Sequence, residues 1–150
     1  MTKFLRWTAH QNVEVTKSLM SIWIDNYINK DFYQWAIVLK ENNEPIGTIS
    51  VVDQDEKLNL VHIGYCIGAK WWNKGITSEA FSAIISFLFE QVEVNRIEAQ
   101  HDTKNPNSGK VMLKCGLKYE GTLREADINN KGNIIDVSMY SILAKEYYKN

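Results

Sequence analysis

The residues best suited to chemistry lie in segment 63–80, which reads IGYCIGAKWWNKGITSEA. An apolar, glycine-punctuated stretch passes through a basic, tryptophan-rich turn into an expected helix. Gly75 has no Cβ to keep a ligand away, so the backbone N–H groups of Lys74, Gly75, Ile76 and Thr77 can converge on an anion. The helix adds unpaired N–H donors and the positive end of its dipole. The pattern predicts a phosphate-binding corner, although one glycine between a strand and a helix is also typical of an ordinary loop.

Such a corner must be positioned by a strand before it and a helix after it, and the hydrophobic pattern predicts both. After Gly75, the polar residues Ser78, Ser82, Ser86 and Glu90 recur at a spacing of four, which predicts a helix buried on its other sides. Apolar runs separated by turn residues predict the remaining elements. The expected order is a helix over residues 10–29, strands over 33–40, 46–52 and 59–68, a helix over 75–90, a strand over 96–101, a helix over 107–115, and strands over 118–128 and 133–143.

Length and composition limit the class of protein. The chain has 150 residues, of which 45% are hydrophobic and five are Trp. It can therefore bury one core, and a single domain over residues 1–150 is expected. It carries 17 basic and 18 acidic residues, a net charge of −1 and no run of Lys or Arg. A protein dedicated to binding nucleic acid is therefore not expected.

The sequence gives no signal for a membrane span, for export or for a metal. Its longest apolar stretch, residues 80–89, is interrupted by Ser82 and Ser86 and is far short of the roughly 20 residues that a membrane span needs. The N-terminal segment lacks the apolar core of a secretion signal. Cys66 and Cys115 have no paired-ligand spacing. We therefore expect no metal site, no membrane partner and a reduced, cytoplasmic protein.

A second group of motifs lies downstream of the corner. It reads Asn105-Pro106-Asn107-Ser108, then Lys114-Cys115-Gly116-Leu117-Lys118-Tyr119-Glu120-Gly121. Alone, Asn105-Pro106 is typical of a turn and Ser108 of a helix cap. Together with the Gly75 corner and the order of elements, however, the chain from about Trp35 onward resembles the GNAT superfamily of acyl-CoA N-acyltransferases. It is most similar to the branch of bacterial ribosomal-protein N-terminal alanine and serine acetyltransferases.

This resemblance implies an α+β GNAT fold, with a mixed, mostly antiparallel sheet flanked by helices and splayed between the family's fourth and fifth strands. In the family, the pantetheine arm of acetyl-CoA lies in that gap and pairs with the fourth strand, here near Cys66, Ile67 and Gly68. The family grips the coenzyme A pyrophosphate with Arg/Gln-x-x-Gly-x-Gly/Ala, which only Lys74 and Gly75 fit strictly. The full set of counterparts is Trp72, Asn73, Lys74, Gly75, Ile76 and Thr77.

Three further contacts to acetyl-CoA are implied by the resemblance. Asn105 and Ser108 would line the pantetheine and its thiol end. Lys114 would reach the adenosine or its phosphates, unless it is an ordinary solvated lysine on a helix surface.

The implied reaction is direct attack of a neutral amine on the acetyl thioester, with the backbone N–H of Ile67 as oxyanion donor. Many family members place a Tyr acid seven residues after the motif's Asn, where this chain has Met112. Some relatives place a Glu base five residues before that Asn, where this chain has Gln100. Positioning alone, with water taking the proton, is one alternative. The remaining candidates for the base, each of which also fits a structural role, are His62, Glu98 and His101.

The start of the chain bears on assembly. Family members usually begin with a strand and a helix for which this sequence shows no counterpart, so segment 33–40 is expected at a sheet edge with both faces apolar. An uncovered edge invites pairing with another chain, and we therefore expect a homodimer. Folding of the expected helix 10–29 over the edge is the monomeric alternative.

Two functions follow from the resemblance. The first is an N-acetyltransferase that moves an acetyl group from acetyl-CoA to a primary amine, either a protein N-terminus or a small-molecule amine. The second is a non-catalytic acyl-CoA-binding module whose acceptor side has decayed. Met112, Gln100 and the short N-terminal segment favour the second, and the residues of the coenzyme groove favour the first.

Overall fold

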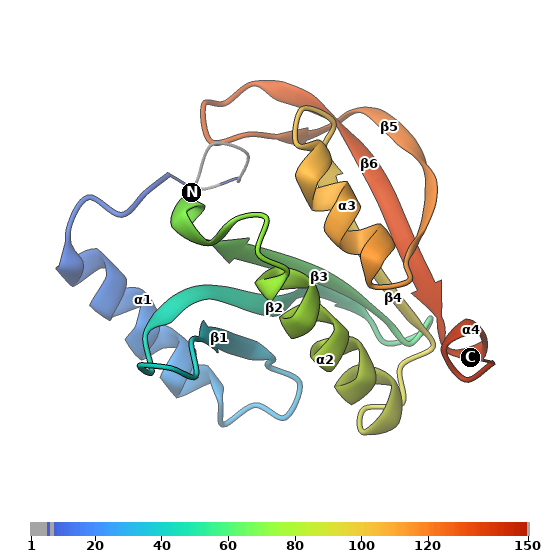
Figure 1. The fold of residues 1–150 in the computed structure, drawn as a ribbon, viewed down its shortest axis with the longest axis horizontal. Coiled ribbons are helices and arrows are strands. Elements are labelled where there is room, and N and C mark those ends of the chain that lie inside the picture. Colours follow the sequence, from blue (N-terminus) through green and yellow to red (C-terminus); the bar gives the residue numbers. More distant parts are fainter. Residues whose placement is uncertain (1–5, 7, 150) are drawn as a thin grey trace.

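The computed structural model describes Arg6 and residues 8–149, which are built around one open six-stranded sheet (Figure 1). The helices α2 and α3 lie side by side over one face of this sheet. The elements in chain order are α1 (Val13–Asn26), β1 (Gln34–Val38), β2 (Pro45–Asp55), β3 (Leu60–Ile67), a 3-10 turn (Ala69–Trp71), α2 (Ile76–Glu90), β4 (Arg96–Asp102), α3 (Pro106–Lys114), β5 (Lys118–Ile128), β6 (Ile134–Leu143) and α4 (Ala144–Tyr147).

The strand order is β1-β2-β3-β4-β6-β5, and every neighbouring pair is antiparallel except β3 and β4. The parallel pair is short, because only Leu60, Val61 and His62 are matched with β4, at its first three residues. Beyond His62 the two strands diverge, and the rest of β3 pairs with β2 alone. The sequence prediction of a mixed, mostly antiparallel sheet splayed at this place is confirmed.

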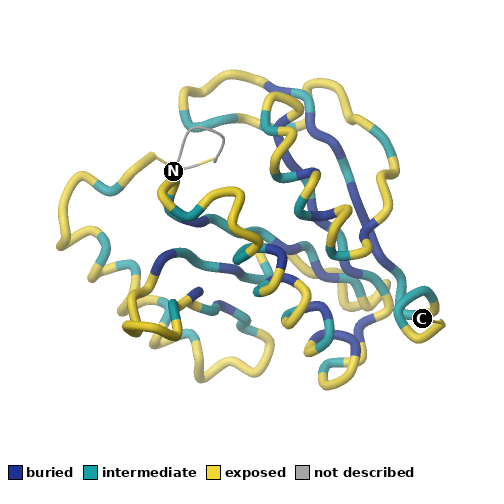
Figure 2. Tube along the Cα trace, in the orientation of Figure 1, coloured by how far each residue is buried: buried dark blue, intermediate teal, exposed yellow. Residues whose placement is uncertain are grey.

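The core lies between the sheet and helices α2 and α3 (Figure 2). Phe81 and Leu88 of α2 and Ile97 of β4 are fully buried. Alternate side chains of a strand point to opposite faces, so the neighbours of Ile97 in β4 point to the face away from α2. This alternation decides which candidate site residues share a face.

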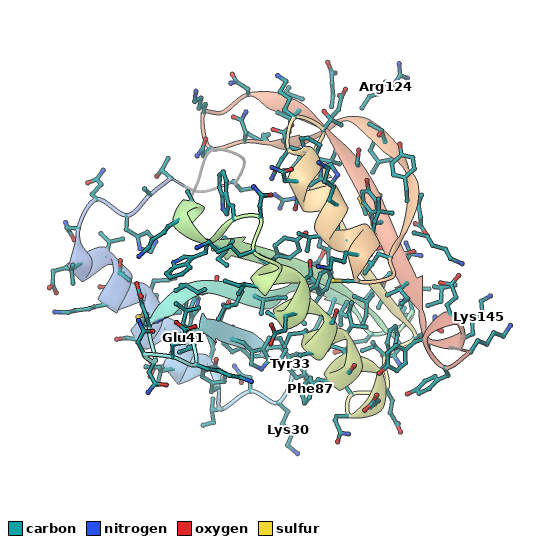
Figure 3. The ribbon with its side chains drawn as sticks, in the orientation of Figure 1. Lys30, Tyr33, Glu41, Phe87, Arg124 and Lys145 are labelled. Carbon is teal, nitrogen blue, oxygen red and sulfur yellow. The ribbon has the colours of Figure 1, made fainter. Side chains whose placement is uncertain are left out.

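Strand β1 forms one edge of the sheet, as the sequence predicted. Its face toward α2 is covered, because Trp35 and the preceding Tyr33 make edge-to-face ring contacts with Phe87 of α2 (Figure 3). The C-cap residue of α1 reaches the edge itself, because the Tyr27 hydroxyl donates a hydrogen bond to the Gln34 carbonyl.

Two predicted elements have wrong bounds. The first helix is Val13–Asn26 rather than residues 10–29, because the Asn12 side chain accepts from the Val15 N–H and caps the helix there. The second strand runs to Asp55, whereas a loop was expected from Asp53. Pairing of its last residues with the start of β3 keeps this polar end extended.

Candidate functional site

The corner at Gly75 has the backbone geometry of an anion site. Gly75 caps α2 with a positive φ of 79°, and Asn73 also has a positive φ, of 59°. Left-handed residues on either side of Lys74 form the kind of turn in which successive N–H groups can converge on an anion. No side chain caps the helix there, so its first-turn donors remain available to a ligand.

A lysine side chain from another element reaches this corner. Lys114 Nζ, from the last turn of α3, lies 3.7 Å from the point that a Cβ on Gly75 would occupy. Lys70 and Lys74 place their Nζ atoms 4.7 and 4.9 Å from the centre of the Trp71 ring. The position of Lys114 favours contact with a bound anion over the alternative of an ordinary solvated lysine.

The end of β3 turns backbone groups into the gap between β3 and β4. The Gly68 N–H donates to the Ile46 carbonyl of β2 at 2.9 Å. Because successive residues of a strand alternate the direction of their N–H and C=O groups, those of Ile67 point to the gap. The Ile67 carbonyl accepts from the Trp72 indole Nε1 at 3.0 Å. Trp72 therefore anchors the strand end, and its contact with coenzyme A stays a prediction.

A cavity of about 1460 Å³ opens beside this gap, bounded by α1, by β1 to β4 and by the turn between β5 and β6. Its lining includes six of the candidate residues, whereas Glu98, Lys114 and the residues of the Gly75 corner do not line it. The six are His62, Cys66, Gly68, His101, Asn105 and Ser108. Asn105 makes no side-chain cap for α3, which leaves its amide available to a ligand.

His62 has the surroundings of a neutral base. Its Nδ1 lies 3.4 Å from Glu98 Oε1, and the other oxygen of Glu98 accepts from Arg96 Nε at 3.0 Å. Burial lowers the pKa of His62 below its ordinary value, with the Glu98 carboxylate partly opposing this effect. Glu98 is thus held in an ion pair with Arg96 and lies beside His62 as an orienting partner.

His101 lies on the opposite face, under α3. Its Nδ1 is 2.7 Å from the Asp102 carbonyl oxygen, so this nitrogen carries the proton and donates. Its buried Nε2 has no hydrogen-bond partner among the described residues. The ring stacks on Tyr140, which fixes its orientation beside the cavity.

Gly109 of α3 allows this packing, and its replacement should destabilise the protein. A Cβ there would lie 2.6 Å from His101 Nε2 and 2.8 Å from the Tyr140 hydroxyl. We expect Gly109→Ala to cost about 1–3 kcal/mol of unfolding free energy in urea titrations, as overpacked cores do. Lys110→Ala, at the next and exposed position, should change it by less than about 0.5 kcal/mol. Equal stability of the two variants would contradict this packing.

Two residues that line the cavity were missed by sequence reasoning. The Tyr65 hydroxyl lies 3.0 Å from both the carbonyl and the hydroxyl oxygen of Ser108, and burial raises the Tyr65 pKa above its ordinary value. Asp127 of β5 accepts from Gln100 Nε2 at 2.9 Å. Tyr65 stands inside the glycine-punctuated segment 63–80, whereas no pattern in the sequence signals Asp127.

Within residues 8–149 and Arg6, no three His, Cys, Asp or Glu side chains gather as a metal site would require. No helix in this described part has both the length and the apolar character to cross a membrane.

Comparison with known proteins matches this chain to acetyltransferases. Residues 1–118 match the family model described as an acetyltransferase (GNAT) domain. The match therefore includes the N-terminal segment, which the motifs did not cover. An uncharacterized N-acetyltransferase p20 of Bacillus licheniformis is 32% identical over 98% of this chain and 82% of its own length. The ribosomal-protein-serine acetyltransferase of Escherichia coli (strain K12) is 31% identical over 73% of this chain and 60% of its own length.

Solved structures resemble the fold closely. The microcin C7 self immunity acetyltransferase MccE, determined in complex with acetyl-CoA and AMP, superimposes with a TM-score of 0.85. The two chains share 26% identity over 95% of this chain and 78% of that chain.

Proposed function

Because the chain belongs to the GNAT acetyltransferase family, we propose that it transfers the acetyl group of acetyl-CoA to the nitrogen of a primary amine. The observation that carries this proposal is the gap that opens between β3 and β4 beyond His62, with the large cavity beside it. The acceptor is either a protein N-terminus or a small-molecule amine.

The corner and the gap suit the two ends of acetyl-CoA. The N–H groups around Gly75 and the ammonium of Lys114 would bind the pyrophosphate. The extended pantetheine arm would run along the open side of β3, with Asn105 and Ser108 beside it, as an added strand would. This places the thioester near Ile67, whose N–H faces the gap.

The chemistry then needs a base and an oxyanion donor. In our proposal His62, neutral because of its burial, takes a proton through cavity water from the amine nitrogen as that nitrogen attacks the acetyl carbonyl carbon. Water must relay the proton because five residues of extended strand, about 16 Å, separate His62 from Ile67. The Ile67 N–H stabilises the charge that develops on the carbonyl oxygen. The C–S bond breaks, the acetyl group stays on nitrogen, and the thiolate leaves with a proton from the Tyr65 hydroxyl or from water.

Product analysis tests this proposal. The protein is incubated with acetyl-CoA and each of a set of amines, including peptides with free N-terminal Ala or Ser and polyamines, and the products are identified by mass spectrometry. An N-acetylated amine supports the proposal. Acetyl-CoA binding without an acetylated product would favour the second candidate, a non-catalytic acyl-CoA-binding module, which Gln100 and the core residue Met112 make reasonable.

Edge strand β1 supports our prediction of a homodimer. It pairs with β2 on one side only, although the Tyr27 hydroxyl binds the Gln34 carbonyl at the open edge, and Ala36 and Val38 on the face away from α2 are exposed. We expect light scattering at micromolar concentration to give the mass of two chains. A monomer whose β1 amides are protected from hydrogen exchange would contradict the homodimer and would favour cover by α1 instead.

A further inference from the structure

A chain of polar contacts crosses the acceptor side of the cavity, on the face of β4 that also carries Glu98. Gln100 of β4 donates its amide to Asp127 Oδ2 at 2.9 Å, and the Arg6 Nε donates to the same oxygen at 2.9 Å. Gln100, Asp127 and Arg6 all line the cavity. The Gln100 side chain is an amide and cannot take a proton. Its hydrogen bond instead holds the Asp127 carboxylate at this place in the cavity.

Asp127 is fixed and largely shielded from solvent. Its side chain is 15% exposed, and its second oxygen accepts from the Ile128 N–H at 2.7 Å. Three donors therefore hold one carboxylate in a single orientation. Such a carboxylate binds a further cation well, because its position does not have to be ordered on binding.

Arg6 is held far less firmly than Asp127. Its side chain is 70% exposed, and exposed ion pairs contribute little to stability. Asp53, Asp102 and Asp127 all line the cavity, whereas Arg6 supplies the one Lys or Arg among the described lining residues. Without Arg6, the lining is acidic and fits a cationic molecule.

We propose that Asp127, positioned by Gln100, docks the protonated amine of the acceptor, and that Arg6 occupies this place until an acceptor arrives. This inference rests on the proposed function, since it assigns the acceptor class of the same site: a cationic amine. The acceptor ammonium replaces the guanidinium as hydrogen-bond donor to Asp127 Oδ2. It then passes one proton to water and reaches the thioester as a neutral amine, and its next proton goes to His62 during the attack.

Steady-state kinetics with saturating acetyl-CoA tests the assignment, with spermidine and a peptide with a free N-terminal serine as probes. Asp127→Asn keeps the shape of the side chain and removes its charge, so the KM for the better probe should rise about tenfold or more. The dissociation constant of acetyl-CoA should not change. Glu125→Gln is the matched control, because it removes an exposed carboxylate from the same strand, and its KM should equal that of the wild type.

Arg6→Ala should act in the opposite direction. Freeing Asp127 should lower the KM for the amine about two- to fivefold, the strength of an exposed ion pair. In the Asp127→Asn background, Arg6→Ala should have no effect, because the contact is already lost. If the ion pair between Arg6 and Asp127 has only a structural role, Arg6→Ala should instead leave the KM for the amine unchanged.

Equal KM values for the Asp127→Asn and Glu125→Gln variants would overturn the assignment, as would a loss confined to kcat. Calorimetric titration of both probes into the protein saturated with coenzyme A separates this inference from the proposed function. If no amine is acetylated, the proposed function fails, yet weaker binding of a probe to Asp127→Asn than to the wild type still supports the docking role. Identical binding to both proteins, or no binding to the wild type, overturns it.

Discussion

Gly75→Glu should lose at least about a hundredfold in affinity for acetyl-CoA, because it changes both the shape and the charge of the corner. The new carboxylate would occupy the concavity beside Lys114 Nζ, which lies 3.7 Å from the position of an added Cβ. It would pair with that ammonium and repel the pyrophosphate. Isothermal titration with acetyl-CoA measures the loss directly.

Gly132→Glu provides a matched control for backbone strain. Gly132 has a φ of 78°, against 79° for Gly75, and an added Cβ would meet no atom within 4 Å. Both variants therefore carry the same conformational cost of a non-glycine residue in the left-handed region. Gly132→Glu should bind acetyl-CoA as the wild type does. If Gly75→Glu also binds with unchanged affinity, the pyrophosphate does not lie at the corner.

His62→Gln should lower kcat by about a hundredfold or more, the usual contribution of a general base. The wild-type rate should fall as the pH drops through the pKa of His62, because the protonated imidazole cannot accept a proton. Burial places this pKa below the ordinary 6.5, so the acid limb of the profile lies below that pH. Rate measurements from acid to neutral pH should show this limb in the wild type and not in His62→Gln.

Glu98→Gln separates the role of the orienting residue from that of the base. Removing the carboxylate removes an influence that raises the His62 pKa, so the acid limb should move to lower pH. The base itself remains, so the plateau rate should fall less than in His62→Gln. Wild-type turnover in all three single variants of His62, Glu98 and His101 would contradict the base and would leave positioning and water to carry the proton transfer.

The sequence predicted the parts of the site that lie close together along the chain. The Gly75 corner could be found because its glycine, its lysine and the helix after it follow one another within a few residues. The splayed sheet followed from the order of elements and from the resemblance to the family. The backbone direction of Ile67 was also predictable, because alternation along a strand is a local property.

The other parts depend on contacts between segments far apart in the sequence. Lys114 reaches Gly75 only because α3 packs beside α2, so the sequence alone left contact and solvation equally reasonable. Asp127 meets Gln100 across strands β5 and β4, which are separated in the sheet by β6. The Trp72 indole N–H donates to the Ile67 carbonyl at the end of β3, a contact that the sequence pattern did not indicate. No periodicity encodes these pairings, since tertiary packing sets them.

Amine-dependent release of free thiol from acetyl-CoA tests the central claim most directly. Thiol is measured with a chromogenic disulfide reagent in the presence and absence of each amine, for the wild type and for His62→Gln. We predict that at least one cationic amine accelerates release well above the rate without acceptor, that acetylated amine and thiol form in equal amounts, and that His62→Gln loses the acceleration. Tight binding of acetyl-CoA with the same slow thiol release whatever amine is added would contradict an acetyltransferase.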